Sequence, residues 1–125
     1  MISASEEKLP HRQVHPSWVH DGEPSSQTFR PTGKDQHKLS VYDGKQISAE
    51  GSHAHYTGLL KLLSAGVLSV SCGEVESAGL AWKVDGIPFP AHGHVDFGNL
   101  NAHQQKAKAS VLKAKAWSRG WTYQP

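Results

Sequence analysis

The chain has 125 residues, 37% of them hydrophobic and 19% charged, which is typical of one compact domain with a modest core. Its formal net charge of +2, with nine histidines counted as neutral, is too small for general nucleic-acid binding, which normally needs a concentrated basic surface. A single cysteine, Cys72, excludes an internal disulfide framework and a multi-cysteine zinc site.

The N-terminal residues are polar and lack the apolar centre of a secretory signal peptide. No apolar stretch approaches the ~20 residues that a membrane span needs. We therefore expect a cytoplasmic protein without a membrane partner. Residues 1–10 predict a flexible N-terminal lead-in, and residues 11–125 predict a single domain.

Two short strands are predicted in the first third of the chain, over residues 12–15 and 39–42. The first ends at a proline and the second at an Asp-Gly turn. Between them, residues 17–38 are rich in Gly, Pro and Ser, which indicates a long irregular loop. Such a loop inside a small domain is uncommon, so it is either functional or contains elements that the pattern does not reveal.

A helix is predicted next, over about 49–64. Ser48 is a preferred N-cap residue, and Glu50 lies in the first turn, where a carboxylate interacts favourably with the helix dipole. Gly66 provides a left-handed stop. The apolar end of this helix is formed by four leucines, Leu59, Leu60, Leu62 and Leu63.

Three further strands are predicted in the second half, over residues 67–72, 80–84 and 92–97. A helical turn over residues 73–79 separates the first two. Together with the N-terminal strands, these segments predict a mixed or antiparallel sheet of about 4–6 short strands.

The last predicted helix, over about 101–118, consists almost entirely of residues that favour helix. Asn101 can cap its N-terminus, Gly120 ends it, and a helical period predicts a buried stripe of Ala107, Val111 and Ala114. With the earlier helix and the sheet, it predicts an α+β fold in one small domain with two main helices.

Three polar side chains alternate along the predicted strand near residue 92. His92, His94 and Asp96 therefore lie on one side of that strand. The two histidines stand about 6–7 Å apart, which suits binding of one metal ion, and Asp96 offers an oxygen ligand. The pattern is thus compatible with a zinc site, and equally with the solvent-facing side of a sheet.

Four polar residues in the first half follow one another on successive predicted elements. Arg12 lies on the first strand, Ser40 and Tyr42 lie on the second, and Glu50 opens the following helix. This succession resembles small ADP-ribosyltransferase-like toxins of the RES type. The resemblance implies an NAD-using enzyme in which Arg12 binds the pyrophosphate, Ser40 or Tyr42 borders the nicotinamide pocket and Glu50 holds a ribose hydroxyl. A planar guanidinium suits phosphate, and a carboxylate suits a diol.

A broader pattern covers most of the chain and resembles a group of small bacterial proteins without an assigned activity. The resemblance implies a bacterial, single-domain protein and no particular chemistry. It is carried by Arg12-Gln-Val-His-Pro16-Ser-Trp18, Ser25-Ser-Gln-Thr-Phe29, Leu39-Ser-Val41, Ser48-Ala-Glu50, Ala91-His92 and Val95-Asp-Phe97.

The sequence contains no complete catalytic triad, phosphate-binding loop or metal signature. We therefore expect a non-catalytic binding or accessory protein that acts through a protein partner and needs no cofactor. Trp18, in the long loop, and Trp121, near the C-terminus, are the expected partner surface. The alternatives are the NAD-using enzyme and the zinc-binding protein. Convergence of Arg12, Ser40 and Glu50 around one cleft would favour the enzyme.

Overall fold

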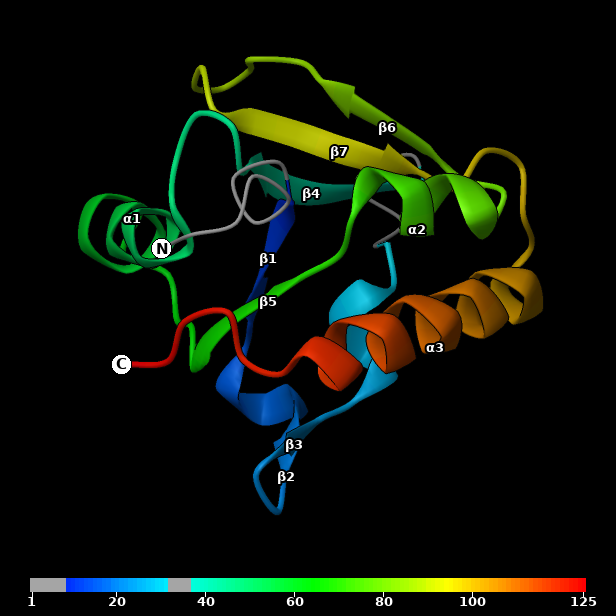
Figure 1. Cartoon of the computed structure of the whole chain (residues 1–125), viewed down its shortest axis with the longest axis horizontal. Helices are drawn as coiled ribbons and strands as arrows, with labels where there is room; N and C mark the ends of the chain where they lie inside the picture. Colours follow the sequence, from blue (N-terminus) through cyan, green and yellow to red (C-terminus); the bar gives the residue numbers. More distant parts are fainter. Residues whose placement is uncertain (1–8, 32–36) are drawn as a thin grey trace.

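The computed structural model of the chain describes residues 9–31 and 37–125. Five of its strands form one antiparallel sheet: β1 (Pro10–Val14), β4 (Lys38–Asp43), β5 (Gly66–Ser69), β6 (Ala81–Val84) and β7 (His92–Asp96). Their order across the sheet is β5-β1-β4-β7-β6 (Figure 1). The expected single α+β domain with one sheet of a few short strands is confirmed.

The expected lead-in over residues 1–10 falls largely outside the described residues. The two of its residues that are described, Leu9 and Pro10, are buried, and Pro10 already belongs to β1. None of the helices in the described ranges combines the length and the apolar character that crossing a membrane requires.

Three α-helices flank the sheet: α1 (Ala49–Ala54), α2 (Cys72–Ser77) and α3 (Ala102–Arg119). In Figure 1, α1 lies on one side of β1 and β5, whereas α3 lies on the other side. The predicted final helix is confirmed with both of its boundary residues. Asn101 accepts a hydrogen bond from the Gln104 amide, and Gly120 ends the helix with φ of 86°.

The predicted helix over 49–64 is too long. Ser48 caps α1 as expected, but α1 passes into a π-helical turn, η5 (His55–Leu59), and the helical path ends before the last leucines. Lys61 then adopts a φ of 58° and reverses the chain. Leu59 and Leu63 stay 70% and 64% exposed. Because these two leucines are mostly exposed among the described residues, little apolar burial is available to extend the helix over them.

The predicted loop over 17–38 contains short elements that its composition does not reveal. They are the 3-10 helices η2 (Pro16–Trp18) and η3 (Ser26–Phe29), and the two-stranded hairpin of β2 (Val19–His20) and β3 (Glu23–Pro24). Residues 32–36 of this segment lie outside the described residues. Phe29, at the end of η3, is buried in the core beside α3.

The main core lies between the sheet and the layer formed by α2, α3 and η3. Alternate residues of the strands supply its sheet side, among them Leu39, Val41 and Val95. Helix α3 buries Ala109, Leu112 and Ala116 instead of the predicted stripe, and Val111 is 44% exposed. The predicted and the observed buried residues both have helical spacing. The helical period alone therefore does not determine which face of α3 packs against the core.

The outer edge of β5 is covered by the end of the chain. The Val67 amide donates to the Tyr123 carbonyl at 2.8 Å, and the Thr122 amide donates to the Val67 carbonyl at 2.9 Å. Gly66 is required beside this contact, because a Cβ atom there would lie 2.8 Å from the Trp121 ring.

Strands β1 and β4 separate soon after they pair. Only Pro10 with Asp43 and His11 with Tyr42 are in register. Arg12 then occupies the opening, where its Nη1 donates to the Ser40 carbonyl at 2.9 Å and its Nε donates to the Thr28 carbonyl at 2.8 Å. This opening in the sheet positions the site described next.

Candidate functional site

A cavity of about 380 Å³ lies at the opening between β1 and β4. We call it the β1–β4 pocket. Arg12, Ser40 and His92 contribute polar groups to it. Its apolar and aromatic walls come from β4, from η5 with the turn that follows, and from the β6–β7 connection: Tyr42, Tyr56, Leu60, Leu62, Pro88 and Phe89.

Phe89 is the centre of an aromatic cluster on one side of this pocket. Its ring stacks on Tyr42 at 5.2 Å between centroids and 29° between planes. It also contacts the rings of His55, at 4.4 Å, and His92, at 5.3 Å. Sequence reasoning missed Phe89 and His55 because the cluster forms from three segments that are distant along the chain.

The hydroxyl of Tyr42 lies 2.8 Å from Nδ1 of His55. Burial, assisted by the nearby Tyr56, raises the pKa of Tyr42. The phenol therefore keeps its proton at neutral pH and can donate it to the imidazole. Tyr42 thus contributes its ring to the pocket while its hydroxyl is already paired.

Asp85 joins the two histidines of β7. Its Oδ1 lies 2.6 Å from Nδ1 of His92, and its Oδ2 lies 2.8 Å from Nδ1 of His94. Partial burial acts to raise the pKa of Asp85, but the hydrogen bonds from His94 and His92 outweigh it and lower the pKa to about 2. Since an ionised carboxylate can only accept, Nδ1 of both rings carries the proton. When these rings are neutral, Nε2 of each is an acceptor.

The predicted metal face is thus only partly assembled. His92 and His94 share a carboxylate, but it is Asp85, whereas Asp96 accepts from the Gly98 amide at 2.8 Å. Across the described ranges, no group of three or more His, Cys, Asp and Glu side chains is arranged to hold a metal ion. Sequence reasoning missed Asp85, because its place beside these histidines depends on the β6–β7 register, in which Val84 pairs with Gly93.

The predicted enzyme residues also separate into two groups. Arg12, Ser40 and Tyr42 all line the β1–β4 pocket. Glu50 instead lines a second cavity, of about 620 Å³, together with His11 and Thr122. Of the three residues whose convergence around one cleft would favour the enzyme, Arg12 and Ser40 therefore border the same pocket and Glu50 does not.

The two tryptophans expected at a partner surface are half-buried. Both pack against the core cluster. The Arg12 guanidinium lies 5.5 Å from the ring centre of Trp18, and Trp121 meets Trp117 edge to face at 5.8 Å. The large apolar residues that are exposed lie elsewhere, around the β1–β4 pocket and on α3 and β6.

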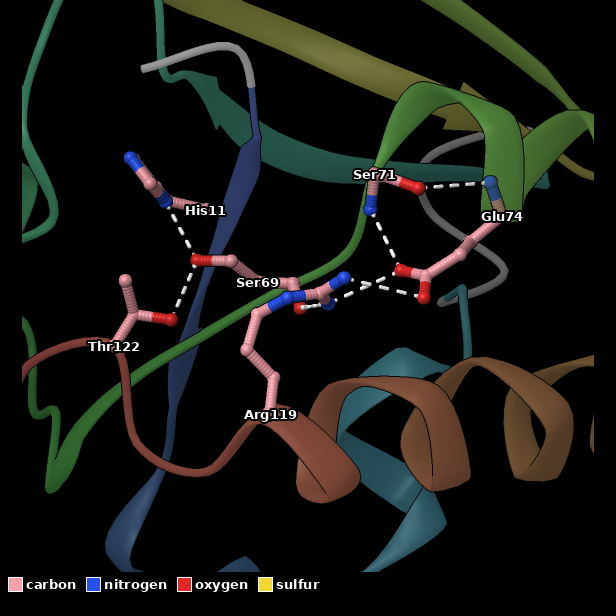
Figure 2. Close-up of polar contacts among 6 residues, drawn as sticks. All are labelled: His11, Ser69, Ser71, Glu74, Arg119 and Thr122. Atoms are coloured by element: carbon pink, nitrogen blue, oxygen red, sulfur yellow. Dashed lines mark hydrogen bonds and ion pairs between the residues drawn. The ribbon is translucent and has the colours of Figure 1, made fainter. Parts of the chain in front are cut away.

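A second polar cluster joins β1, β5 and the C-terminal segment (Figure 2). Nδ1 of His11 lies 2.6 Å from Oγ of Ser69, and Oγ1 of Thr122 donates to the same Oγ at 2.8 Å. Burial lowers the pKa of His11 to about 4, although Asp43 and the Ile47 backbone act in the opposite direction. The ring is therefore neutral at pH 7, and its Nδ1 accepts the Ser69 proton.

Arg119 extends this cluster from the end of α3, as Figure 2 shows. Its Nη1 donates to the Ser69 carbonyl at 2.9 Å and pairs with Oε1 of Glu74 at 3.0 Å. Glu74 also caps α2 reciprocally with Ser71. Burial acts to raise the pKa of Glu74, but bonds from Arg119 and Ser71 outweigh it and lower the pKa. These bonds link α2, α3 and β5.

No protein-family model, curated protein or solved structure matches this chain. The function must therefore follow from the chemistry of the β1–β4 pocket. Its walls suit a bulky nonpolar group, and His92 places one polar group beside that space.

Proposed function

We propose that this protein is a non-catalytic binding protein that holds one bulky side chain of a protein partner in the β1–β4 pocket. The observation that carries the proposal is the exposure of large apolar side chains around the pocket mouth. Leu60 and Leu62 line the pocket and are 38% and 47% exposed, and Ile87, next to the lining Pro88, is 73% exposed. Apolar patches of this kind mark interaction surfaces.

The shape of the pocket supports the same proposal. A buried aromatic or aliphatic anchor in a pocket commonly supplies most of the binding energy of an interface. The neighbouring leucines would exclude water from such an anchor.

Lys61 lies between two of these leucines and is exposed, and it has no ion-pair partner among the described residues. The partner segment is therefore expected to carry an acidic residue beside its anchor. We place this binding in the bacterial cytoplasm, without a cofactor.

The test uses short labelled peptides that carry a single Leu, Phe, Tyr or Trp next to two aspartates, with fluorescence anisotropy as the measurement. Native protein is expected to bind at least one of them saturably. Phe89→Ala and Leu60→Ser should each weaken this binding about tenfold or more, because both remove pocket wall. Val111→Ser, which changes an exposed apolar residue of α3, is the matched control and should leave the binding unchanged. Absence of saturable binding to every peptide would refute the proposal.

A second candidate is an NAD-using transferase. It is favoured by one observation, that Arg12, Ser40 and Tyr42 border the same pocket. Calorimetric titration with NAD tests it. Saturable binding that disappears in Ser40→Leu, which narrows the pocket, would support the enzyme. A native protein that gives no heat of binding with NAD would reject it.

A further inference from the structure

We propose that the β1–β4 pocket selects an indole, the side chain of tryptophan, by pairing the indole N–H with Nε2 of His92. This inference rests on the proposed anchor pocket and specifies which anchor it takes. It follows from three features of the pocket: a fixed acceptor, flat aromatic walls, and several neighbouring polar groups that are already paired or cannot accept.

The acceptor is set by Asp85. Because the carboxylate takes the proton-bearing Nδ1 of His92 at 2.6 Å, the neutral ring presents an unprotonated Nε2. That nitrogen has no hydrogen-bond partner in the part of the chain that the structure describes. His92 borders the pocket, and its side chain is only 17% exposed. An occupant without a donor would shield this nitrogen from water and leave it unpaired, which costs binding energy.

The walls suit a flat ring. Phe89 and Tyr42 stack at 29° to one another, and the edge of Phe89 meets His92 at 87°. Pro88 and Leu60 add further apolar wall. Aromatic rings that pack against such surfaces gain energy beyond their buried area.

Three other polar side chains at the pocket compete weakly for the indole N–H, and the Ser40 hydroxyl is tested by substitution below. The Tyr42 hydroxyl is paired with His55. The Gln13 side chain uses both ends of its amide, since Nε2 donates to Ser52 and Oε1 accepts from Ser64. Arg12 has only donors, which cannot accept an N–H. Tryptophan is the matching side chain, because its ring nitrogen is a donor only.

Indole and benzofuran separate the hydrogen bond to His92 from packing in the pocket. Benzofuran has the same shape as indole but an ether oxygen in place of the N–H. Titration of native protein followed by protein NMR is expected to show indole binding about threefold to tenfold tighter, the contribution of one hydrogen bond. Asp85→Asn should abolish the preference, because the new amide can donate to Nδ1 and move the ring proton to Nε2. Asp96→Asn changes a carboxylate on the same strand as His92 that is bonded to the Gly98 amide instead, and it should keep the preference.

A second measurement needs no variant. The ¹⁵N spectrum of His92 in native protein should show an unprotonated Nε2 that shifts when indole binds and shifts less with benzofuran. Equal affinities for the two probes would overturn the selection while leaving the anchor pocket intact. A preference that survives Asp85→Asn but is lost in Ser40→Ala would overturn it as well, because the acceptor would then be Ser40. If neither probe nor any peptide binds, the anchor pocket itself fails.

Discussion

Two histidine clusters lie on the same face of the sheet and have opposite surroundings. His11, Tyr42 and His92 face one another in register across β1, β4 and β7, so their side chains share that face. At one end, His11 is 2% exposed and bonded to Ser69, which also receives the Thr122 hydroxyl. At the other end, the side chain of His92 is 17% exposed and, among the residues that the structure describes, is hydrogen-bonded only through Nδ1.

The difference comes from what lies over each histidine. The C-terminal segment covers the His11 end and pairs its polar atoms, so we expect that cluster to contribute to stability. In the described ranges, the β6–β7 connection and the turn after η5 lie over the His92 end and line the β1–β4 pocket with it, and they give Nε2 of His92 no hydrogen bond. We expect this second cluster to contribute little to stability and most of the binding. The predictions below test that contrast, beginning with the largest effect.

Acid should weaken the fold through His11. The unfolded histidine takes up a proton as the pH falls below about 6.5, whereas the folded one resists until about 4. Protons therefore favour the unfolded state across this window, and the contribution of His11, complete above pH 6.5, is lost as the pH falls. The expected loss is about 3 kcal/mol of unfolding free energy. Urea unfolding at several pH values measures it, and His11→Gln should show a clearly smaller decrease. Equal decreases in the two proteins would contradict the role of His11.

Ser69→Ala should cost about 1–3 kcal/mol of unfolding free energy, because it leaves His11 and Thr122 with unpaired polar atoms. Ser40→Ala changes a serine at the β1–β4 pocket and should change the free energy by only about 0.5 kcal/mol. Chemical denaturation of both variants beside the native protein gives the comparison. If the two substitutions cost the same, the two clusters do not differ as described.

Arg119→Met should cost at most about 1 kcal/mol. Its pair with Glu74 is partly exposed, and such pairs contribute little, although the bond to the Ser69 carbonyl is lost as well. Lys115→Met, at an exposed position of the same helix, is the control and should be near neutral. The thermal midpoints of the two variants, measured side by side, give the loss of stability that is specific to Arg119. A loss far above that of an exposed pair would mean that the Ser69 carbonyl depends on Arg119.

The smallest effect on stability is expected at Leu59 and Leu63, which adjoin the lining residues Leu60 and Leu62. Leu59→Ser with Leu63→Ser should change the unfolding free energy by no more than about 0.5 kcal/mol, because both side chains are mostly exposed. The same double variant should bind the anchor peptides more weakly. A large loss of stability with unchanged binding would reverse the contrast between the two clusters.

The regular elements were predictable from local patterns. Alternation identified the strand at residues 92–97, and helix-favouring residues between Asn101 and Gly120 identified the last helix. The helix over 49–64 was extended too far because leucines at helical spacing usually mark a buried stripe. Here the described residues leave these leucines between 38% and 70% exposed, and the local pattern contains no information about that.

The site was predictable only in part. His92 was found from strand alternation, whereas Arg12, Ser40 and Tyr42 were singled out by the resemblance to the RES-type toxins. Asp85 and Phe89 were not, because their roles depend on the register of the β6–β7 hairpin and on how it folds over β4. Side chains separated along the chain meet through tertiary packing, which strand alternation does not encode.

The hydrogen bonds between Val67 and the last residues of the chain have a practical consequence for handling the protein. Removing residues 121–125, or straining them with a fused tag, would leave the Val67 amide and carbonyl unpaired at the edge of β5. Such a strand recruits identical neighbours and starts aggregation. Trimmed preparations are therefore expected to precipitate during storage, and affinity tags belong at the other terminus.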